Sequence, residues 1–128
     1  MSVSAELTKV TIVEGSASAL LARMVNLDGD YLTQSSVASI AFTVYDLGAA
    51  GAQSSAGTFV VASTVFNSLQ TGLEWTRDDT GYNFRGPMEA SHFPTGGRQY
   101  LVVLGITPTS GDVIWKRWEY TVLENPST

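Results

Sequence analysis

Short segments in which apolar and polar residues alternate recur along the chain. The clearest of them are 39–46, 99–107 and 113–123. Because successive side chains of a strand point to opposite faces, this alternation predicts three β-strands, each with one apolar face toward a core. The apolar residues that share those faces form the predicted core: Ile40, Phe42, Val44, Tyr100, Val102, Leu104, Trp118, Tyr120 and Val122.

Weaker patterns predict further strands, at 6–13, 19–25, 58–61 and 82–85. The segment 19–25 also contains good helix formers, but its short length and the turns beside it favour a strand. The segment 63–69 fits either a short strand or a helical turn. Pro87 cannot donate a hydrogen bond to a neighbouring strand, so it restricts the strand that contains it to a sheet edge or a bulge.

Turn residues separate these segments. Asp28-Gly29 and Ser110-Gly111 each predict a β-hairpin, since glycine supplies the positive φ that tight turns require. Ser35 or Ser36 can cap a single helical turn. The stretch 47–57 is rich in Gly, Ala and Ser and has no period, which is typical of an irregular surface loop.

The sequence therefore predicts an all-β fold. We expect about seven short strands, at most one or two short helical turns, and an antiparallel sandwich. The chain of 128 residues matches one domain, so 1–128 is predicted to form a single sandwich, with 1–5 and 124–128 as extended or flexible tails.

Composition limits the possible partners. Charged residues make up only 15% of the chain and the net charge is -5, so phosphate backbones and anionic membrane surfaces are disfavoured. The absence of cysteine excludes disulfides, thiol catalysis and cysteine-ligated zinc. The first residues show no basic segment followed by an apolar run, so no signal peptide is expected. No apolar stretch reaches the roughly 20 residues that cross a bilayer.

Three groups of residues have side chains that could bind a metal or take part in catalysis, but each group has a simpler structural interpretation. Asn26, Asp28 and Asp30 alternate like the start of a calcium loop, but no glutamate follows at the required spacing, which favours a plain turn. Asp78 and Asp79 are adjacent in a turn, where both carboxylates are normally solvated. His92 is the only histidine and lies in a loop. We therefore predict no enzyme activity, no cofactor and no metal site.

The face of 113–123 opposite the predicted core is also partly apolar. It carries Val113, Trp115 and Arg117, and Leu101 and Val103 give the strand 99–107 a second apolar face. An exposed apolar strip of this kind is most often a protein interface. Two alternatives are the core of a second sheet and an aromatic platform for sugars.

Several segments resemble small β-sandwich proteins from the structural gene clusters of tailed bacteriophages. They are Arg23-Met24-Val25, Val37-Ala38-Ser39-Ile40, Phe42-Thr43-Val44-Tyr45-Asp46, Asp79-Thr80-Gly81-Tyr82-Asn83-Phe84 and Trp118-Glu119-Tyr120-Thr121-Val122. The resemblance covers most of the chain, and its motifs are structural, not catalytic.

This resemblance implies an immunoglobulin-like sandwich that is made in the host cytoplasm and ends up in the virion. A capsid decoration protein that binds the major capsid lattice is the expected role, with a tail, baseplate or head–tail connector protein as the alternative. The expected partners are other virion proteins and further copies of the chain. A carbohydrate-binding or adhesion module is the alternative from another class.

Overall fold

The computed structural model describes residues 7–26, 28–72 and 75–126. The described strands are β1 (Leu7–Val13), β2 (Ser18–Ala22), β3 (Val37–Asp46), β4 (Ala52–Phe59), β5 (Val65–Gln70), β6 (Tyr82–Met88), β7 (Arg98–Pro108) and β8 (Ile114–Leu123). Single helical turns lie at η1 (Gln34–Ser36), η2 (Leu47–Ala49), α1 (Val61–Thr64) and η3 (Ala90–His92). These turns fall far short of the length and apolar character of a membrane-spanning helix.

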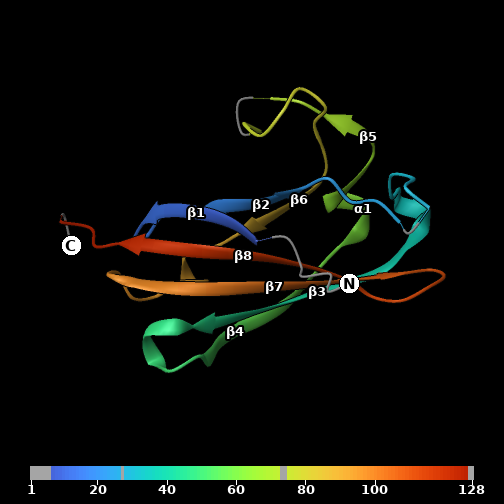
Figure 1. Cartoon of the computed structure of the whole chain (residues 1–128). Helices are drawn as coiled ribbons and strands as arrows, with labels where there is room; N and C mark the ends of the chain where they lie inside the picture. Colours follow the sequence, from blue (N-terminus) through green and yellow to red (C-terminus); the bar gives the residue numbers. More distant parts are fainter. Residues whose placement is uncertain (1–6, 27, 73–74, 127–128) are drawn as a thin grey trace.

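The strands form two sheets, as the all-β prediction requires. The larger sheet has the order β1-β8-β7-β3-β4, and the smaller has the order β2-β6-β5. In Figure 1 the five strands of the larger sheet lie one below the other from β1 to β4. Side chains from the facing sides of both sheets meet in one core, which makes the fold a sandwich.

All nine residues predicted to face the core are buried, with no more than 5% of any of them exposed. They come from the three central strands of the larger sheet. The smaller sheet contributes Leu20, Phe84 and Met88 to the same cluster. Phe93 joins it from the turn before β7 and stacks on Tyr120, with ring centroids 4.2 Å apart.

One pairing departs from the predicted antiparallel arrangement. β1 runs parallel to β8, from Leu7 beside Arg117 to Val13 beside Leu123. After β1 the chain turns at Gly15 and enters β2, which belongs to the other sheet. The partner of β1 is therefore a strand that arrives from the far end of the sequence, and its direction is not set by a hairpin.

The prediction of an irregular loop over 47–57 is wrong. Residues 52–57 belong to β4, which pairs with β3 so that Ala56 lies beside Thr43 and Thr58 lies beside Ala41. An edge strand made of small residues needs no apolar period, so the pattern does not reveal it. Gly57 is required here, because a Cβ at this position would lie 2.8 Å from the ring of Phe42.

Of the two alternatives predicted for Pro87, a sheet edge or a bulge, the sheet edge is wrong, because β6 is the central strand of its sheet. Pro87 pairs with Ala19 of β2 on one side. On the other side, the register with β5 reaches only Tyr82 and Phe84. Pro87 thus lies beyond the part of β6 that pairs with β5, where a missing N–H donor is tolerated.

The two predicted hairpins differ in outcome. β7 and β8 pair as expected around Ser110-Gly111. At Asp28-Gly29 the turn is present, but β2 ends at Ala22 and β3 lies in the other sheet. Val25 and Tyr31 form an isolated bridge across that turn.

Helical turns are more numerous than the one or two predicted, with four in the described part of the chain. Ser35 or Ser36 was predicted to cap a single helical turn, but both residues lie within the turn η1, whose N-cap is Thr33. The segment 63–69 contains both of its alternatives, the end of α1 and most of β5. Turns of three or four residues carry no measurable period, which is why the pattern underestimates them.

The predicted tails are only partly described. Residues 1–5 lie outside the described residues. Of 124–128, Asn125 is anchored, since its side chain donates a hydrogen bond to the carbonyl of Glu14.

Candidate functional site

The side of the larger sheet that faces away from the core is the candidate functional site. We call it the outer face, and it consists of the outward residues of β1, β8, β7, β3 and β4. The strand registers arrange these residues in rows across the sheet. One row contains Leu7, Arg117, Val103, Thr43 and Ala56, and the next contains Lys9, Glu119, Leu101, Tyr45 and Gln53.

Trp115 is the most exposed large aromatic residue on this face, with 57% of its surface accessible. It lies beside Gly105 of β7. A Cβ at Gly105 would come within 2.8 Å of the Trp115 ring, so the indole lies directly over the glycine. Gly105 thereby leaves room for a flat aromatic ring on the sheet, with one ring face covered by backbone and the other open.

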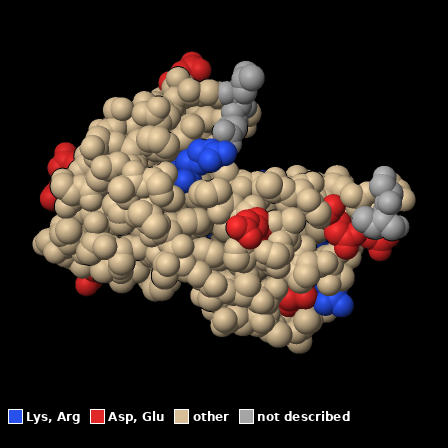
Figure 2. Space-filling model, turned by 180° about the vertical axis from the view of Figure 1, so that it is seen from behind, with Lys and Arg blue, Asp and Glu red and all other residues tan. Residues whose placement is uncertain are grey.

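Charge is confined to one side of the outer face. Every outward position of β7, β3 and β4 is described, and none carries a charged side chain. The charged residues are Lys9, Arg117 and Glu119 on β1 and β8. Figure 2 views the molecule from behind relative to Figure 1. On that side too, Lys, Arg, Asp and Glu form only isolated patches. A neutral face with an exposed tryptophan is typical of a protein interface.

The five residues predicted for an interface all lie on or beside this face. Leu101, Val103 and Arg117 are half-buried in its centre, and Trp115 is exposed. Val113, 40% exposed, immediately precedes β8. Their common placement follows from the pairing of β7 with β8.

Sequence reasoning missed the part of the outer face that lies on β3 and β4. The alternation over 39–46 already places Ala41, Thr43 and Tyr45 opposite the core. The signal was therefore present, but the strand order that sets these residues beside Leu101 and Val103 is a tertiary property.

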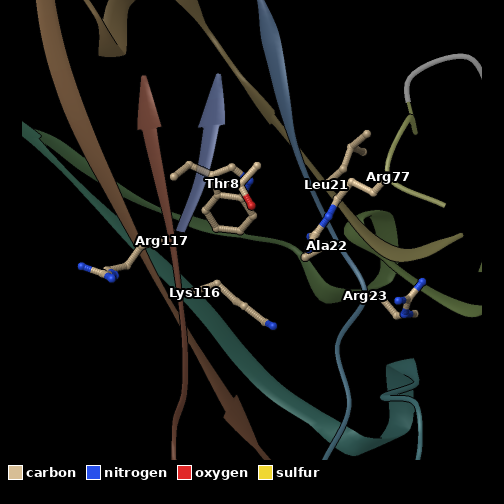
Figure 3. A pocket seen from close by; sticks show the side chains of 8 residues that line it. Thr8, Leu21, Ala22, Arg23, Arg77, Lys116 and Arg117 are labelled. Atoms are coloured by element: carbon tan, nitrogen blue, oxygen red, sulfur yellow. The ribbon is translucent and has the colours of Figure 1, made fainter. Parts of the chain in front are cut away.

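A small cavity between the two sheets is a second candidate. Its volume is about 10 Å³, room for one water molecule. Four of the seven Lys and Arg residues of the chain line it: Arg23, Arg77, Lys116 and Arg117. Lys116 and Arg117 point in opposite directions from β8, Lys116 toward Arg23 and Arg117 away from it (Figure 3).

The local electrostatics of this cavity act on Lys116. Burial lowers the pKa of Lys116, and the positive charges of Arg77 and Arg23 lower it further. The cavity is too small for an organic substrate, so we assign it no ligand.

Asp78 is held by donors on several sides. Its carboxylate accepts hydrogen bonds from the indole N–H of Trp75 at 2.9 Å and from Arg23 at 2.8 Å. It also accepts from the backbone N–H groups of Thr80 and Gly81. These bonds, led by those from Trp75 and Arg23, hold the pKa of Asp78 well below its usual range. Asp78 is therefore an ionised anchor for this loop.

The other two groups of possible chemistry also have structural roles. The ring of His92 shares a hydrogen bond of 2.8 Å with Ser55 and meets the ring of Phe42 edge-on, which joins η3 to β4. The side chain of Asn26 accepts from the backbone N–H groups of Asp28 and Asp30, as in an ordinary Asx turn. Across the described ranges, no group of three or more His, Asp or Glu side chains could hold a metal ion.

Comparison with known proteins adds no relative, since no protein-family model, no curated protein and no solved structure matches the chain.

Proposed function

We propose that this chain is a non-enzymatic structural protein of a tailed-phage virion, a capsid decoration protein that attaches through the outer face. The observation that carries the proposal is Trp115, which lies exposed over Gly105 at the border of the uncharged part of the outer face, formed by β7, β3 and β4. The phage assignment itself is supported by the sequence resemblance. The outer face supplies the means of attachment.

We also propose that the sandwich is immunoglobulin-like. The order β2-β6-β5 opposite β8-β7-β3 corresponds to the B-E-D and G-F-C strands of that fold, with β4 as C′. Tyr100, near the start of β7, supports this assignment. Its hydroxyl accepts a hydrogen bond from the N–H of Thr95 at 2.9 Å and donates to the carbonyl of the same residue at 3.3 Å. This is the arrangement called a tyrosine corner.

Attachment would be driven by burial of the apolar residues of the outer face. Leu101, Val103 and Tyr45 are central and only half-buried, so each still has surface that a partner can remove from water. Trp115 would be the dominant contact, because exposed tryptophans that become buried on binding commonly contribute about 2 kcal/mol or more. The absence of charge on β7, β3 and β4 means that burial of this region leaves no unpaired ion.

The test is co-sedimentation of the purified chain with capsids and, separately, with tails of the phage that encodes it. We expect binding to capsids, and we expect Trp115→Ala to weaken it by about tenfold or more while the protein stays folded. Tyr31→Ala is the matched control, because Tyr31 is an aromatic residue with 48% exposure that lies in the connection between β2 and β3, away from the strands of the larger sheet. This control should bind like the wild type.

Other results would reassign the function. Binding to tails alone would favour the tail, baseplate or connector alternative. Quenching of tryptophan fluorescence by glycans, without particle binding, would favour an adhesion module. If the Trp115→Ala protein unfolds, Trp115 is needed for the stability of the fold and is not an interface residue.

A further inference from the structure

We propose that the free edge of β4 pairs with the β4 edge of a second copy of this chain, so that the two larger sheets join into one continuous sheet across a two-fold axis. Three features of the molecule support this pairing: the open backbone of β4, the uncharged sequence of this strand, and Val60, which follows it. The pairing uses the edge of the sheet and leaves Trp115 free for the particle that the proposed function assigns to it.

The backbone of β4 is open on one side. β4 is the last strand in the order β1-β8-β7-β3-β4 and pairs with β3 alone within that sheet (Figure 1). In an antiparallel pair every second residue directs its N–H and C=O away from its neighbour. Among the described residues no further strand takes up these groups on β4. Such a row of donors and acceptors is a template for another strand.

The sequence of β4 suits a strand from an identical chain. Residues Ala52–Phe59 include neither a charged residue nor a proline, the usual protection of an edge, whereas the opposite edge strand β1 carries Lys9. A two-fold axis sets residues near it against their own copies, so a charge there would face a like charge. The edges of the smaller sheet are also uncharged, but β2 has only five residues and the register of β5 is irregular.

Val60 is an apolar residue that a strand beside β4 would cover. It has the largest exposed fraction, 68%, of the large apolar residues in the described ranges. Its backbone is still extended, with φ -79° and ψ 120°, so it continues the alternation of β4 and shares a side with Ala56 and Thr58. Removal of its surface from water favours a strand at this edge.

The regular part of the edge determines where the axis passes. Ser54 has no partner on β3, because Val44 pairs with Ser55 and Tyr45 pairs with Gln53. The hydroxyls of Ser54 and Ser55 also bond to His92 in η3. Beyond Val60 the chain turns into α1. The segment 56–60 is therefore the regular and accessible part of this edge, and Thr58 is its centre.

An axis at Thr58 gives a register in which every pair is compatible. Thr58 lies opposite its own copy, and Ala56 of each chain lies opposite Val60 of the other on the same side of the sheet. On the side toward the core, Gly57 lies opposite Phe59. No charged residue meets another across this axis.

The geometry of the pairing is compatible with the proposed function. A two-fold axis between antiparallel neighbours runs perpendicular to the sheet, so the outer faces of both copies lie on the same side. Both Trp115 side chains then face the same surface. Two linked outer faces bind a particle more tightly than one, since the second contact becomes intramolecular.

A disulfide crosslink tests the register directly, because the chain contains no cysteine. Residues opposite one another in an antiparallel pair have Cα atoms about 4.5–5.5 Å apart, within the range of about 4.4–6.8 Å that a disulfide bridges. We expect Thr58→Cys, at about 100 μM and with oxidised glutathione, to form a covalent dimer on non-reducing electrophoresis. Ala41→Cys is the matched control. Ala41 is exposed and lies beside Thr58 on β3, so the two copies of residue 41 are three strand spacings apart, about 14 Å, and should not crosslink.

A charge at the axis tests the pairing without a crosslink. Thr58→Lys sets two ammonium groups opposite each other and should weaken the dimer about tenfold or more in sedimentation velocity. Ala41→Lys adds the same charge to the same row of the sheet, one strand away from the axis. This control should dimerise within a few-fold of wild type.

Three results would overturn the pairing: a wild-type chain that stays monomeric at about 100 μM, equal crosslinking of Thr58→Cys and Ala41→Cys, or equal dimerisation of the two lysine variants. If the chain is monomeric and Thr58→Lys alone of the two lysine variants loses capsid binding, β4 pairs with a strand of the particle and the second copy is ruled out. A monomer that sediments with capsids removes the dimer and keeps the proposed function, whereas a crosslinked dimer that ignores every particle does the reverse.

Discussion

Asp78 is the residue whose surroundings differ most from those of an ordinary surface carboxylate. Its four donors come from Arg23, Trp75, Thr80 and Gly81, so it connects the end of β2 to the loop that leads into β6. Because the bonds favour the charged form, the pKa of Asp78 is lowered in the folded state. The contribution of Asp78 to the free energy of unfolding therefore depends on pH.

We expect Asp78→Asn to destabilise the protein in a pH-dependent way. The unfolded carboxyl has a pKa of about 3.9 and the folded one lies well below it, so the stabilisation is fully present above about pH 5, begins to fall near pH 4 and is lost only as the pH passes through the lower pKa of the folded state. The difference between the urea unfolding midpoints of wild type and variant should therefore narrow between pH 7 and pH 3. Asp79→Asn is the control and should differ little from wild type. A gap that stays constant with pH would contradict the assigned role.

At this scale the sequence identifies some residues and not others. The alternation over 113–123 separates Trp115 from Trp118, and the structure places the first outside and the second in the core. The partners of Asp78 were not predictable beyond its own turn. Arg23 lies 55 residues away and reaches it only because β2 and the loop before β6 are neighbours in space.

Among the elements, the connection between β2 and β3 depends on one buried side chain of β6. Asn83 is 1% exposed, and its side-chain oxygen accepts from the N–H of Met24. Its side-chain NH₂ donates to the carbonyls of Met24 and Leu32, at 2.9 and 3.0 Å. The chain crosses from one sheet to the other here, so Asn83 replaces the hydrogen bonds that a paired strand would supply.

Asn83→Ala should lower the free energy of unfolding by about 2–4 kcal/mol, because it removes three hydrogen bonds to buried backbone groups, and of these groups the carbonyl of Met24 keeps a second bond, from the N–H of Leu32. Asn67→Ala is the matched control. The side chain of Asn67 accepts a hydrogen bond from the exposed N–H of Gln34, and the loss of this bond should cost less than about 1 kcal/mol. Urea unfolding at neutral pH measures both. Equal losses for the two variants would show that Asn83 is not the anchor we describe.

Prediction of the elements succeeded where one face of a strand had to be apolar. β3, β7 and β8 each have one face in the core and another outside it, so alternation reveals them. β4 has mostly small residues at the edge of the sheet, and the same rule does not detect it. Its residues Ala56 and Thr58 complete the outer face, so the missed strand is also the missed part of the candidate site.

For the whole molecule, the sequence predicts a sandwich but not the order of its strands. Tyr120 of β8 is hydrogen-bonded to Ser18 of β2, which is 102 residues earlier and in the other sheet. Local patterns do not encode such distant pairs. The parallel pairing of β1 with β8 also joins residues that are far apart in the sequence, so local patterns do not encode it either. This pairing sets Lys9 beside Glu119 on the outer face.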